Sequence, residues 1–228
     1  MYLDLGEKYT RQAIRVEAVE LLVAFKSFFR HEELSSVLGI PPSVLSRYHL
    51  GHMVPNTETA ERIVKVLLSD KLVKRFVSRA LMKLKGDIFR FLMNQRNLEV
   101  VSAYISEKLI AHFGIDGASK YSIVTIPDYS VPLASSVAKR LGLSMIILDP
   151  VVSASVQKLS SVPSIEKGSD VIAVTALLCQ DTATELTAKI ADARATLRGI
   201  ASILKAEVTE SVTSNFTRSG VTVFSVLP

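Results

Sequence analysis

Apolar residues recur at helical spacing through the first half of the chain. In the stretch 12–29 they lie three or four positions apart, which is typical of an amphipathic helix. Shorter stretches of the same kind cover 32–38 and 42–50, and another begins at Thr57, which we expect to be an N-cap. Gly39 separates the first two short stretches, because helices commonly end at a glycine with positive φ. The pattern therefore predicts one longer helix followed along the chain by several short helices.

The pattern changes character along the rest of the chain. Residues 70–95 predict a basic amphipathic helix broken near Gly86, and residues 98–113 predict another helix. After Gly117, β-branched runs alternate with helical patterns. We expect strands at 122–126, 144–148, 171–174, 195–204 and 221–226, helices at 131–141 and 182–192, and a loop rich in Ser, Val and Pro over 149–169. Strands that alternate with helices predict a mostly parallel sheet covered on both faces.

Composition excludes several classes of protein. The chain has 228 residues, of which 48% are hydrophobic and 21% charged, so it is globular rather than disordered. Its single Cys excludes an internal disulfide framework and a Cys-rich zinc site. The four His show no metal-ligand spacing, so we expect no metal and no cofactor. Because the N-terminus is charged and no apolar run approaches ~18 residues, we expect no signal peptide, no membrane span and a cytoplasmic protein.

Charge is distributed unevenly between the two halves. Residues 1–120 hold 18 basic and 13 acidic residues, a balance of +5, whereas residues 121–228 hold nine of each. Residues 62–96 hold ten basic and two acidic residues, a balance of +8. A basic half joined to a neutral half favours a polyanionic partner for the first half. A basic helix face that is simply solvated is the alternative.

Residues 32–63 carry the pattern of two short helices joined by a tight turn. Ile40, Leu45 and Tyr48 are expected to face inward and to fix the second helix against the first. Glu32 and Glu33 are expected to be solvated residues that complement the helix macrodipole. The segment resembles the helix-turn-helix of the phage-repressor-like DNA-binding family, and the matching positions are Leu34, Gly39, Ile40, Ser43, Leu45, Ser46, Arg47, Gly51 and Pro55.

This resemblance implies that the second helix enters the major groove of duplex DNA. The positions that would read bases are Pro42, Ser43, Val44 and Arg47. Candidate contacts to the DNA backbone are Ser46, His49 and His52, with Lys65, Lys71, Lys74 and Arg75 as further phosphate candidates. Pro42 departs from the family, which often has a Gln there, so base-specific hydrogen bonding is expected to be sparse. A helical unit that binds proteins remains the alternative.

The second half carries a different pattern. Ile126 and Pro127 end a strand, and a small loop, Asp128-Tyr129-Ser130, precedes Val131-Pro132-Leu133-Ala134 and a helix. This order resembles the type I phosphoribosyltransferases, over residues 97–228. The resemblance implies that the small loop binds pyrophosphate. It also implies that a later loop at a helix N-terminus binds the 5′-phosphate of phosphoribosyl pyrophosphate.

Two departures set the chain apart from these enzymes. Thr175 and Ala176 stand where the family has two acidic residues that bind the ribose hydroxyls. The phosphate loop, Cys179-Gln180-Asp181-Thr182-Ala183, has no Gly, although Gly lets a backbone approach a phosphate closely. Thr182 and Glu185 also read as a capping box that would occupy the free N–H groups. We therefore expect no catalysis; the ligand-binding candidates are Asp128, Tyr129, Ser130, Cys179, Gln180, Asp181 and Thr182.

Together the two patterns predict three segments. They are a helix-turn-helix DNA-binding domain at 1–70, a basic helical linker at 71–96 and a phosphoribosyltransferase-like domain at 97–228. The expected function is a homodimeric transcriptional regulator that resembles archaeal regulators fusing these two modules. The C-terminal domain would pair the subunits, and it either binds a nucleotide or phosphoribosyl compound or serves as a scaffold. The alternative is an active nucleobase or orotate phosphoribosyltransferase with a fused regulatory head.

Overall fold

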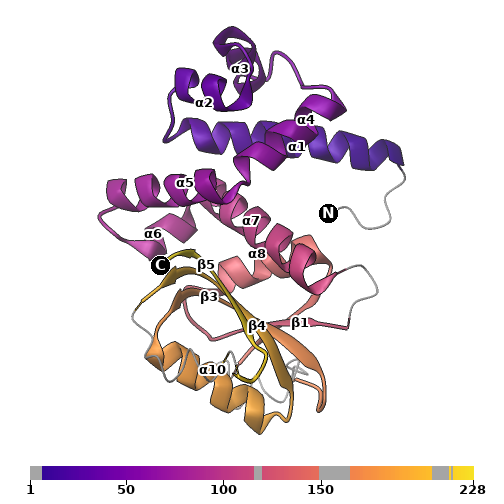
Figure 1. The fold of residues 1–228 in the computed structure, drawn as a ribbon, viewed down its shortest axis with the longest axis vertical. Coiled ribbons are helices and arrows are strands. Elements are labelled where there is room, and N and C mark those ends of the chain that lie inside the picture. Colours follow the sequence, from indigo (N-terminus) through magenta and orange to yellow (C-terminus); the bar gives the residue numbers. More distant parts are fainter. Residues whose placement is uncertain (1–6, 116–119, 149–164, 207–215, 217) are drawn as a thin grey trace, which may run out of the picture. The chain divides into compact units, whose positions relative to one another are not determined.

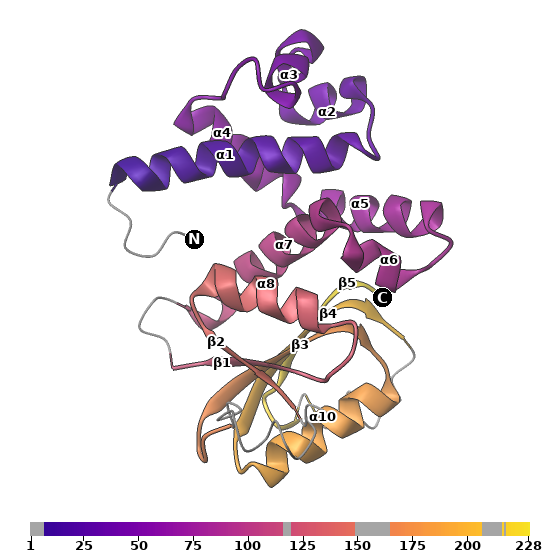
Figure 2. The same ribbon diagram turned by 180° about the vertical axis from the view of Figure 1, so that it is seen from behind.

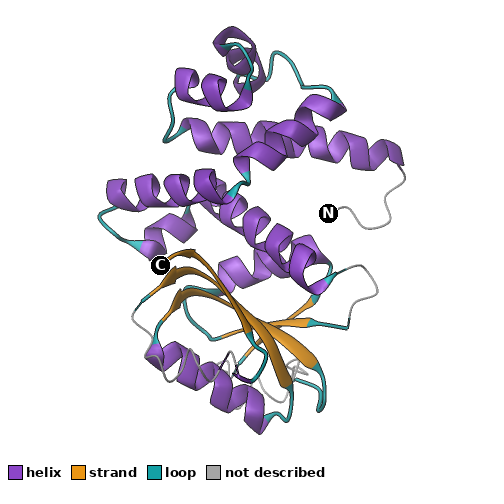
Figure 3. Cartoon of the chain, viewed as in Figure 1, coloured by secondary structure: helices purple, strands orange, loops and turns teal. Residues whose placement is uncertain are grey.

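The computed structural model describes residues 7–115, 120–148, 165–206, 216 and 218–228 (Figure 1). The chain divides into two compact units, residues 1–104 and residues 105–228. The boundary falls inside helix α7 (Gln95–Phe113). Helices make up the described part of the first unit, and the strands lie in the second (Figure 3). Residues 149–164 of the predicted long loop lie outside the described residues.

The helices of unit 1 follow the predicted order, with changes at the end of α1 and at the cap of α4. Helix α1 ends at Lys26, three residues before the predicted end. Asn56 rather than Thr57 caps α4, because the Asn56 side chain accepts the Thr59 N–H at 2.8 Å. The predicted long basic helix is broken near Gly86, as expected. The elements are α1 (Glu7–Lys26), α2 (His31–Leu38), α3 (Pro42–His49), α4 (Thr57–Leu67), α5 (Asp70–Lys83), α6 (Ile88–Met93) and the first half of α7.

An aromatic cluster joins α1 to α5 in the core of unit 1. Phe25 and Phe76 are fully buried, and their ring centroids lie 4.8 Å apart. Phe28 meets Phe76 edge-on at 5.1 Å. Tilted and edge-to-face pairs of this kind add stability beyond the apolar area they bury. Helix α5 is therefore packed into the helical unit rather than held out as a free linker.

Unit 2 is built on a parallel sheet. Within the described residues the sheet has five strands in the order β2-β1-β3-β4-β5, and all neighbouring strands pair in parallel. Helix α8 (Val131–Leu141) connects β1 to β2, and α10 (Gln180–Asp192) connects β3 to β4 in the opposite direction along the sheet. Because connections between parallel strands are right-handed, the two helices cover opposite faces of the sheet (Figure 2). The strands are β1 (Ser122–Thr125), β2 (Ser144–Ile147), β3 (Asp170–Leu178), β4 (Thr196–Lys205) and β5 (Thr222–Leu227). The mostly parallel sheet is thus confirmed.

Strand β3 is longer than the sequence predicts, because it continues past Val174 to Leu178 while it pairs with β4. On β4, Gly199 accommodates the end of α7. A Cβ at Gly199 would lie 2.7 Å from Cζ of Phe113. In the part of the chain that the structure describes, no helix is long and apolar enough to cross a membrane.

Candidate functional site

The first candidate site is the pair of short helices α2 and α3. Gly39 ends α2 with a φ of 63°, so a left-handed turn joins the two helices as the sequence predicts. Pro42 occupies the first turn of α3, where its missing N–H is harmless. Leu45 and Tyr48 turn inward and keep 2% and 7% of their surface exposed. These contacts fix one side of α3 and leave the other side outward.

The predicted reading residues lie on or beside that outward side. Pro42, Ser43 and Arg47 are exposed, and Val44 is half-buried. Arg47 also holds the following turn, because its carbonyl oxygen accepts the N–H of His52 at 2.9 Å. Among the residues predicted to contact the DNA backbone, His52 is exposed, and Ser46 and His49 are half-buried.

The predicted phosphate contacts of the basic stretch have different surroundings. Lys65, Lys71 and Lys74 are exposed. Arg75 instead forms an ion pair with Glu33 of α2, with Nη2 at 3.3 Å from Oε1. The two terminal nitrogens of Arg79, Nη2 and Nη1, donate to the two oxygens of the same carboxylate, at 2.7 and 3.1 Å. The guanidinium of Arg79 also donates to the carbonyl of Phe28 at 2.9 Å and stacks 4.3 Å over the Phe29 ring. We call these contacts the Glu33 clamp.

The Glu33 clamp contradicts the expectation that Glu33 is a solvated helix-start residue. Glu33 Oε2 also accepts the N–H of Arg30 at 3.0 Å, which is half of a capping box. The hydrogen bonds from Arg79 and from this N–H lower the pKa of Glu33 to about 2. Glu33 raises the pKa of Arg79 in turn. The spacing of Arg30 and Glu33 could have indicated the cap, whereas the partners on α5 lie more than 40 residues away and left no local signal.

The second candidate site lies where the order of the sheet reverses. Strands β1 and β3 are neighbours, and their crossovers leave in opposite directions. In open α/β sheets, ligands bind outside the carboxyl ends of the strands at such a switch point. The loop Asp128-Tyr129-Ser130 follows β1, and Cys179 follows β3. The two predicted ligand loops thus lie together at the carboxyl ends of β1 and β3.

Ser130 ties these two loops together. It is fully buried, and its Oγ accepts the N–H of Ala176 at 2.8 Å. Its Oγ also lies 3.2 Å from the Thr175 hydroxyl, which donates to the carbonyl of Leu177. Strand β1 pairs with β3 only as far as Ala173. Ser130 therefore extends the hydrogen bonding of β3 beyond β1, at Thr175 and Ala176.

Cys179 is the N-cap of α10, which begins at Gln180. The predicted capping box of Thr182 and Glu185 is therefore wrong: Thr182 lies in the first turn, and Glu185 pairs with Lys189 at 2.6 Å. The Cys179 sulfur lies 3.2 Å from the Thr182 hydroxyl. Hydrogen bonds from the Thr182 side chain and backbone lower the pKa of the Cys179 thiol.

Tyr129 belongs to the same group of side chains. Burial raises the pKa of Tyr129, and the nearby charges of Asp128 and Cys179 raise it further. Gln180 and Thr182 are half-buried, and Asp181 is exposed on the first turn of α10. The structure thus brings together the residues that the sequence predicts for a ligand, with the last three on a helix rather than in a loop.

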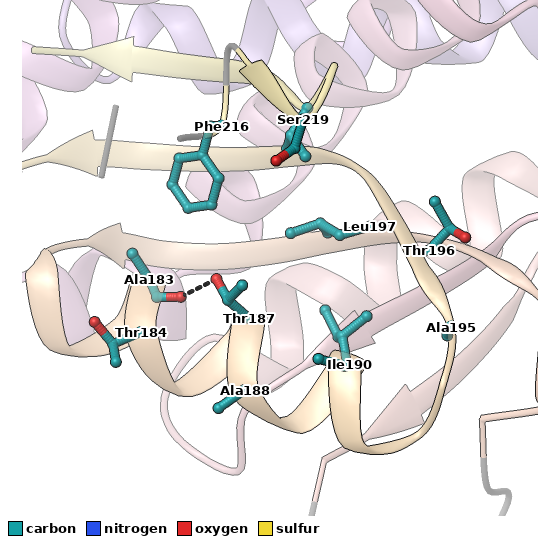
Figure 4. A pocket seen from close by; sticks show the side chains of 12 residues that line it. Ala183, Thr184, Thr187, Ala188, Ile190, Ala195, Thr196, Leu197, Phe216 and Ser219 are labelled. Atoms are coloured by element: carbon teal, nitrogen blue, oxygen red, sulfur yellow. Dashed lines mark hydrogen bonds between the residues drawn. The ribbon is translucent and has the colours of Figure 1, made fainter. Parts of the chain in front are cut away.

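A separate apolar hollow of about 550 Å³ lies along α10 (Figure 4). Ala183, Thr187 and Ile190 of α10 face Leu197 of β4 and Phe216 across it. The Thr187 hydroxyl donates to the Ala183 carbonyl at 2.6 Å, so it offers no strong donor to a ligand. None of the predicted ligand residues lines this hollow.

Comparison with known proteins gives matches only among solved structures. No family model and no curated protein matches the chain. The UMP synthase of Leishmania donovani is 16% identical, and the match covers 75% of this chain and 39% of that one, with a TM-score of 0.49. A phosphoribosyltransferase of Corynebacterium diphtheriae is 12% identical over 62% of this chain and 80% of that one, with a TM-score of 0.48. The orotate phosphoribosyltransferase of Aeropyrum pernix is 19% identical over 62% and 76%, with a TM-score of 0.43.

The expectation that the chain is not an enzyme finds no support in these matches, because the matched structures are by name phosphoribosyltransferases and a UMP synthase. At such low identity they concern the fold alone. The parallel sheet and its switch point agree with a phosphoribosyltransferase-like α/β unit.

Proposed function

We propose that the chain is a DNA-binding regulator that reads duplex DNA through α3, and that unit 2 binds a nucleotide or phosphoribosyl compound. The observation that carries the first part is the sidedness of α3. Leu45 and Tyr48 are buried, whereas Pro42, Ser43 and Arg47 are exposed on the opposite side. A helix–turn–helix unit that enters the major groove requires this division between a packed side and a reading side.

The size and chemistry of α3 fit the groove. An α-helix with its side chains is about 10–12 Å in diameter, and the major groove is about 12 Å wide. Arg47 can donate two hydrogen bonds to guanine O6 and N7 or hold a phosphate. Pro42 offers apolar contact only, so most of the affinity would come from phosphates.

Pairing of two chains would complete the DNA-binding form. Two recognition helices that reach successive turns of the duplex, about 34 Å apart, bind more tightly than one. We propose that unit 2 supplies this two-fold contact. A homodimer in solution by light scattering, retained when Arg47 is replaced, would support this part.

The test of DNA binding is the salt dependence of affinity for duplex DNA, including the promoter of the protein's own gene. Unit 1 has four exposed candidate cations for phosphate contact: Arg47, Lys65, Lys71 and Lys74. Since each phosphate contact contributes about −0.9, each copy of unit 1 is expected to give a slope of about −3.6 in log affinity against log salt. Arg47→Ala should abolish binding or sequence preference, whereas Arg218→Ala on unit 2 should leave both unchanged. Flat or absent binding would refute the proposal.

The two neighbours Lys74 and Arg75 offer a sharper comparison. Lys74 is exposed, whereas Arg75 is paired with Glu33. Lys74→Gln should therefore reduce the slope by about 0.9, and Arg75→Gln should leave it nearly unchanged. Equal effects of the two substitutions would show that the Glu33 clamp does not hold Arg75 away from DNA.

Phosphoribosyl transfer is the second candidate function. The convergence of Asp128, Tyr129 and Cys179 at the switch point of the sheet favours it. The measurement is release of pyrophosphate from phosphoribosyl pyrophosphate in the presence of each nucleobase and orotate. Release that depends on the added base would establish this function. Binding without release would leave unit 2 as a sensor.

A further inference from the structure

Two histidines pack against each other where α2 begins and α3 ends. His31 is the first residue of α2, and His49 is the last residue of α3. Their ring centroids lie 6.0 Å apart with an angle of 74° between the planes. Both side chains are half-buried. The contact therefore joins the two ends of the α2–α3 pair on the opposite side of the tight turn at Gly39.

Each ring turns one nitrogen into the protein. Nε2 of His31 and Nδ1 of His49 are buried, and neither has a hydrogen-bond partner within the described residues. A neutral imidazole can place a bare lone pair at such a position. A protonated ring must place an N–H there, and a buried N–H without an acceptor is costly. The packing therefore suits two neutral rings.

The charges around the pair act in the same direction. Burial lowers the pKa of His31 most, and the positive charge of Lys26 on α1 and of His49 on α3 lowers it further. Glu32, on the helix of His31 itself, acts weakly in the opposite sense. A proton on His31 would therefore place a positive charge beside Lys26 and beside His49.

We propose that His31 and His49 form a proton-sensitive contact that holds α3 against α2 when neutral and loosens it in mild acid. The consequence for DNA, loss of binding as the pH falls, rests on the proposed function. The proton-sensitive packing itself does not. Because the neutral form of His31 is favoured in the folded state, the unfolded chain binds more protons below pH 6.5, and stability falls as the pH is lowered through that value.

Exposed histidines near DNA have the opposite effect. Phosphates favour the protonated form of a nearby imidazole, so a DNA contact by His52 would strengthen binding as the pH falls. His52 is exposed and lies three residues beyond His49. The direction of the pH dependence therefore separates the His31–His49 contact from an ordinary phosphate contact, and His52 provides the matched control.

The experiment is thermal unfolding of the full chain between pH 8.0 and 5.5, with DNA affinity measured over the same range. The wild type should lose melting temperature and DNA affinity below about pH 6.5. His31→Gln and His49→Gln should each flatten both dependences, and His52→Gln should leave the loss of melting temperature intact. Circular dichroism at pH 8.0 confirms that each variant is folded.

The outcomes separate the alternatives. Equal acid loss of melting temperature in the wild type and both pair variants would overturn the proposal. A melting temperature that rises with Zn²⁺ in the wild type and not in His31→Gln would also overturn it, because the inward nitrogens would then serve a metal ion. If the pair variants remove the acid loss but no variant binds DNA at any pH, the proton-sensitive contact stands and the proposed function fails.

Discussion

Glu33→Gln is the most direct test of how α2 is held on α5. The substitution keeps the size of the side chain and removes the charge that Arg75 and Arg79 share. It also exchanges a bidentate ion pair for a single hydrogen bond from the Arg79 guanidinium to a neutral amide oxygen, and bidentate pairs between two charged groups are stronger. The aromatic stacking of Arg79 over Phe29 remains. The loss therefore reports the carboxylate and not the packing around it.

The magnitude follows from the titration of the carboxylate. The pKa of Glu33 falls from its ordinary 4.5 to about 2. A fully shielded group with that difference would contribute about 3 kcal/mol. Glu33 keeps 34% of its side chain exposed and Arg79 keeps 36%, and exposed ion pairs contribute only about 1 kcal/mol. We therefore expect a loss of about 1 kcal/mol at pH 7, or roughly 4 °C in melting temperature for a unit of this size.

The assay is thermal unfolding of the full chain followed by far-UV circular dichroism at pH 7 and at pH 3.5. A carboxylate with a lowered pKa stabilises the folded state above pH 4.5, and this contribution disappears as the pH falls toward 2. The gap between Glu33→Gln and the wild type should therefore narrow in acid. Glu32→Gln, an exposed neighbour in the same helical turn, is the control. A Glu33→Gln protein no less stable at pH 7 than Glu32→Gln would refute the reasoning.

Two further predictions concern unit 2. Gly199→Ala should destabilise the protein by about 1–2 kcal/mol, as overpacking does, because the new methyl group would lie 2.7 Å from the Phe113 ring; urea unfolding measures it, and an unchanged midpoint would show that the ring moves aside freely. Ser130→Ala should cost about 1–3 kcal/mol, because it leaves a buried N–H of β3 without its acceptor. Ser135→Ala, an exposed site on α8, is the control for Ser130.

The sequence predicted an element correctly where a pattern in the nearby residues was enough to determine it. The glycine turn at Gly39 and the inward Leu45 and Tyr48 follow from helical periodicity and from the backbone freedom of glycine. The parallel sheet follows from the alternation of strands and helices. These features depend on neighbours within about ten residues, which the sequence displays directly.

Two errors concern where an element begins or ends; a distant partner set the first and a local cap set the second. Strand β3 extends past Val174 because β4 keeps pairing with it and because Ser130, more than 40 residues earlier, caps its exposed edge. Thr182 reads as a helix cap, yet the helix begins two residues earlier at Gln180 because Cys179 takes the extended conformation of an N-cap. Residue propensities predict the start of a helix only to within about a turn. The ends of a strand depend on the strands with which it pairs.

In the basic stretch, too, partners elsewhere in the fold decide which charges are available to the proposed DNA interface. Counting residues gives a balance of +8 for 62–96, but a charge acts on a partner only where it is exposed and uncommitted. Arg75 and Arg79 are held by Glu33, and Arg90 pairs with Asp87 at 3.2 Å. Arg75 and Arg79 thus hold α5 against α2, since a planar guanidinium suits bidentate and stacked contacts. The exposed lysines, together with the exposed Arg62 and Arg96, are left as the cations for a polyanion, so the proposed binding would be weakly specific and strongly dependent on salt.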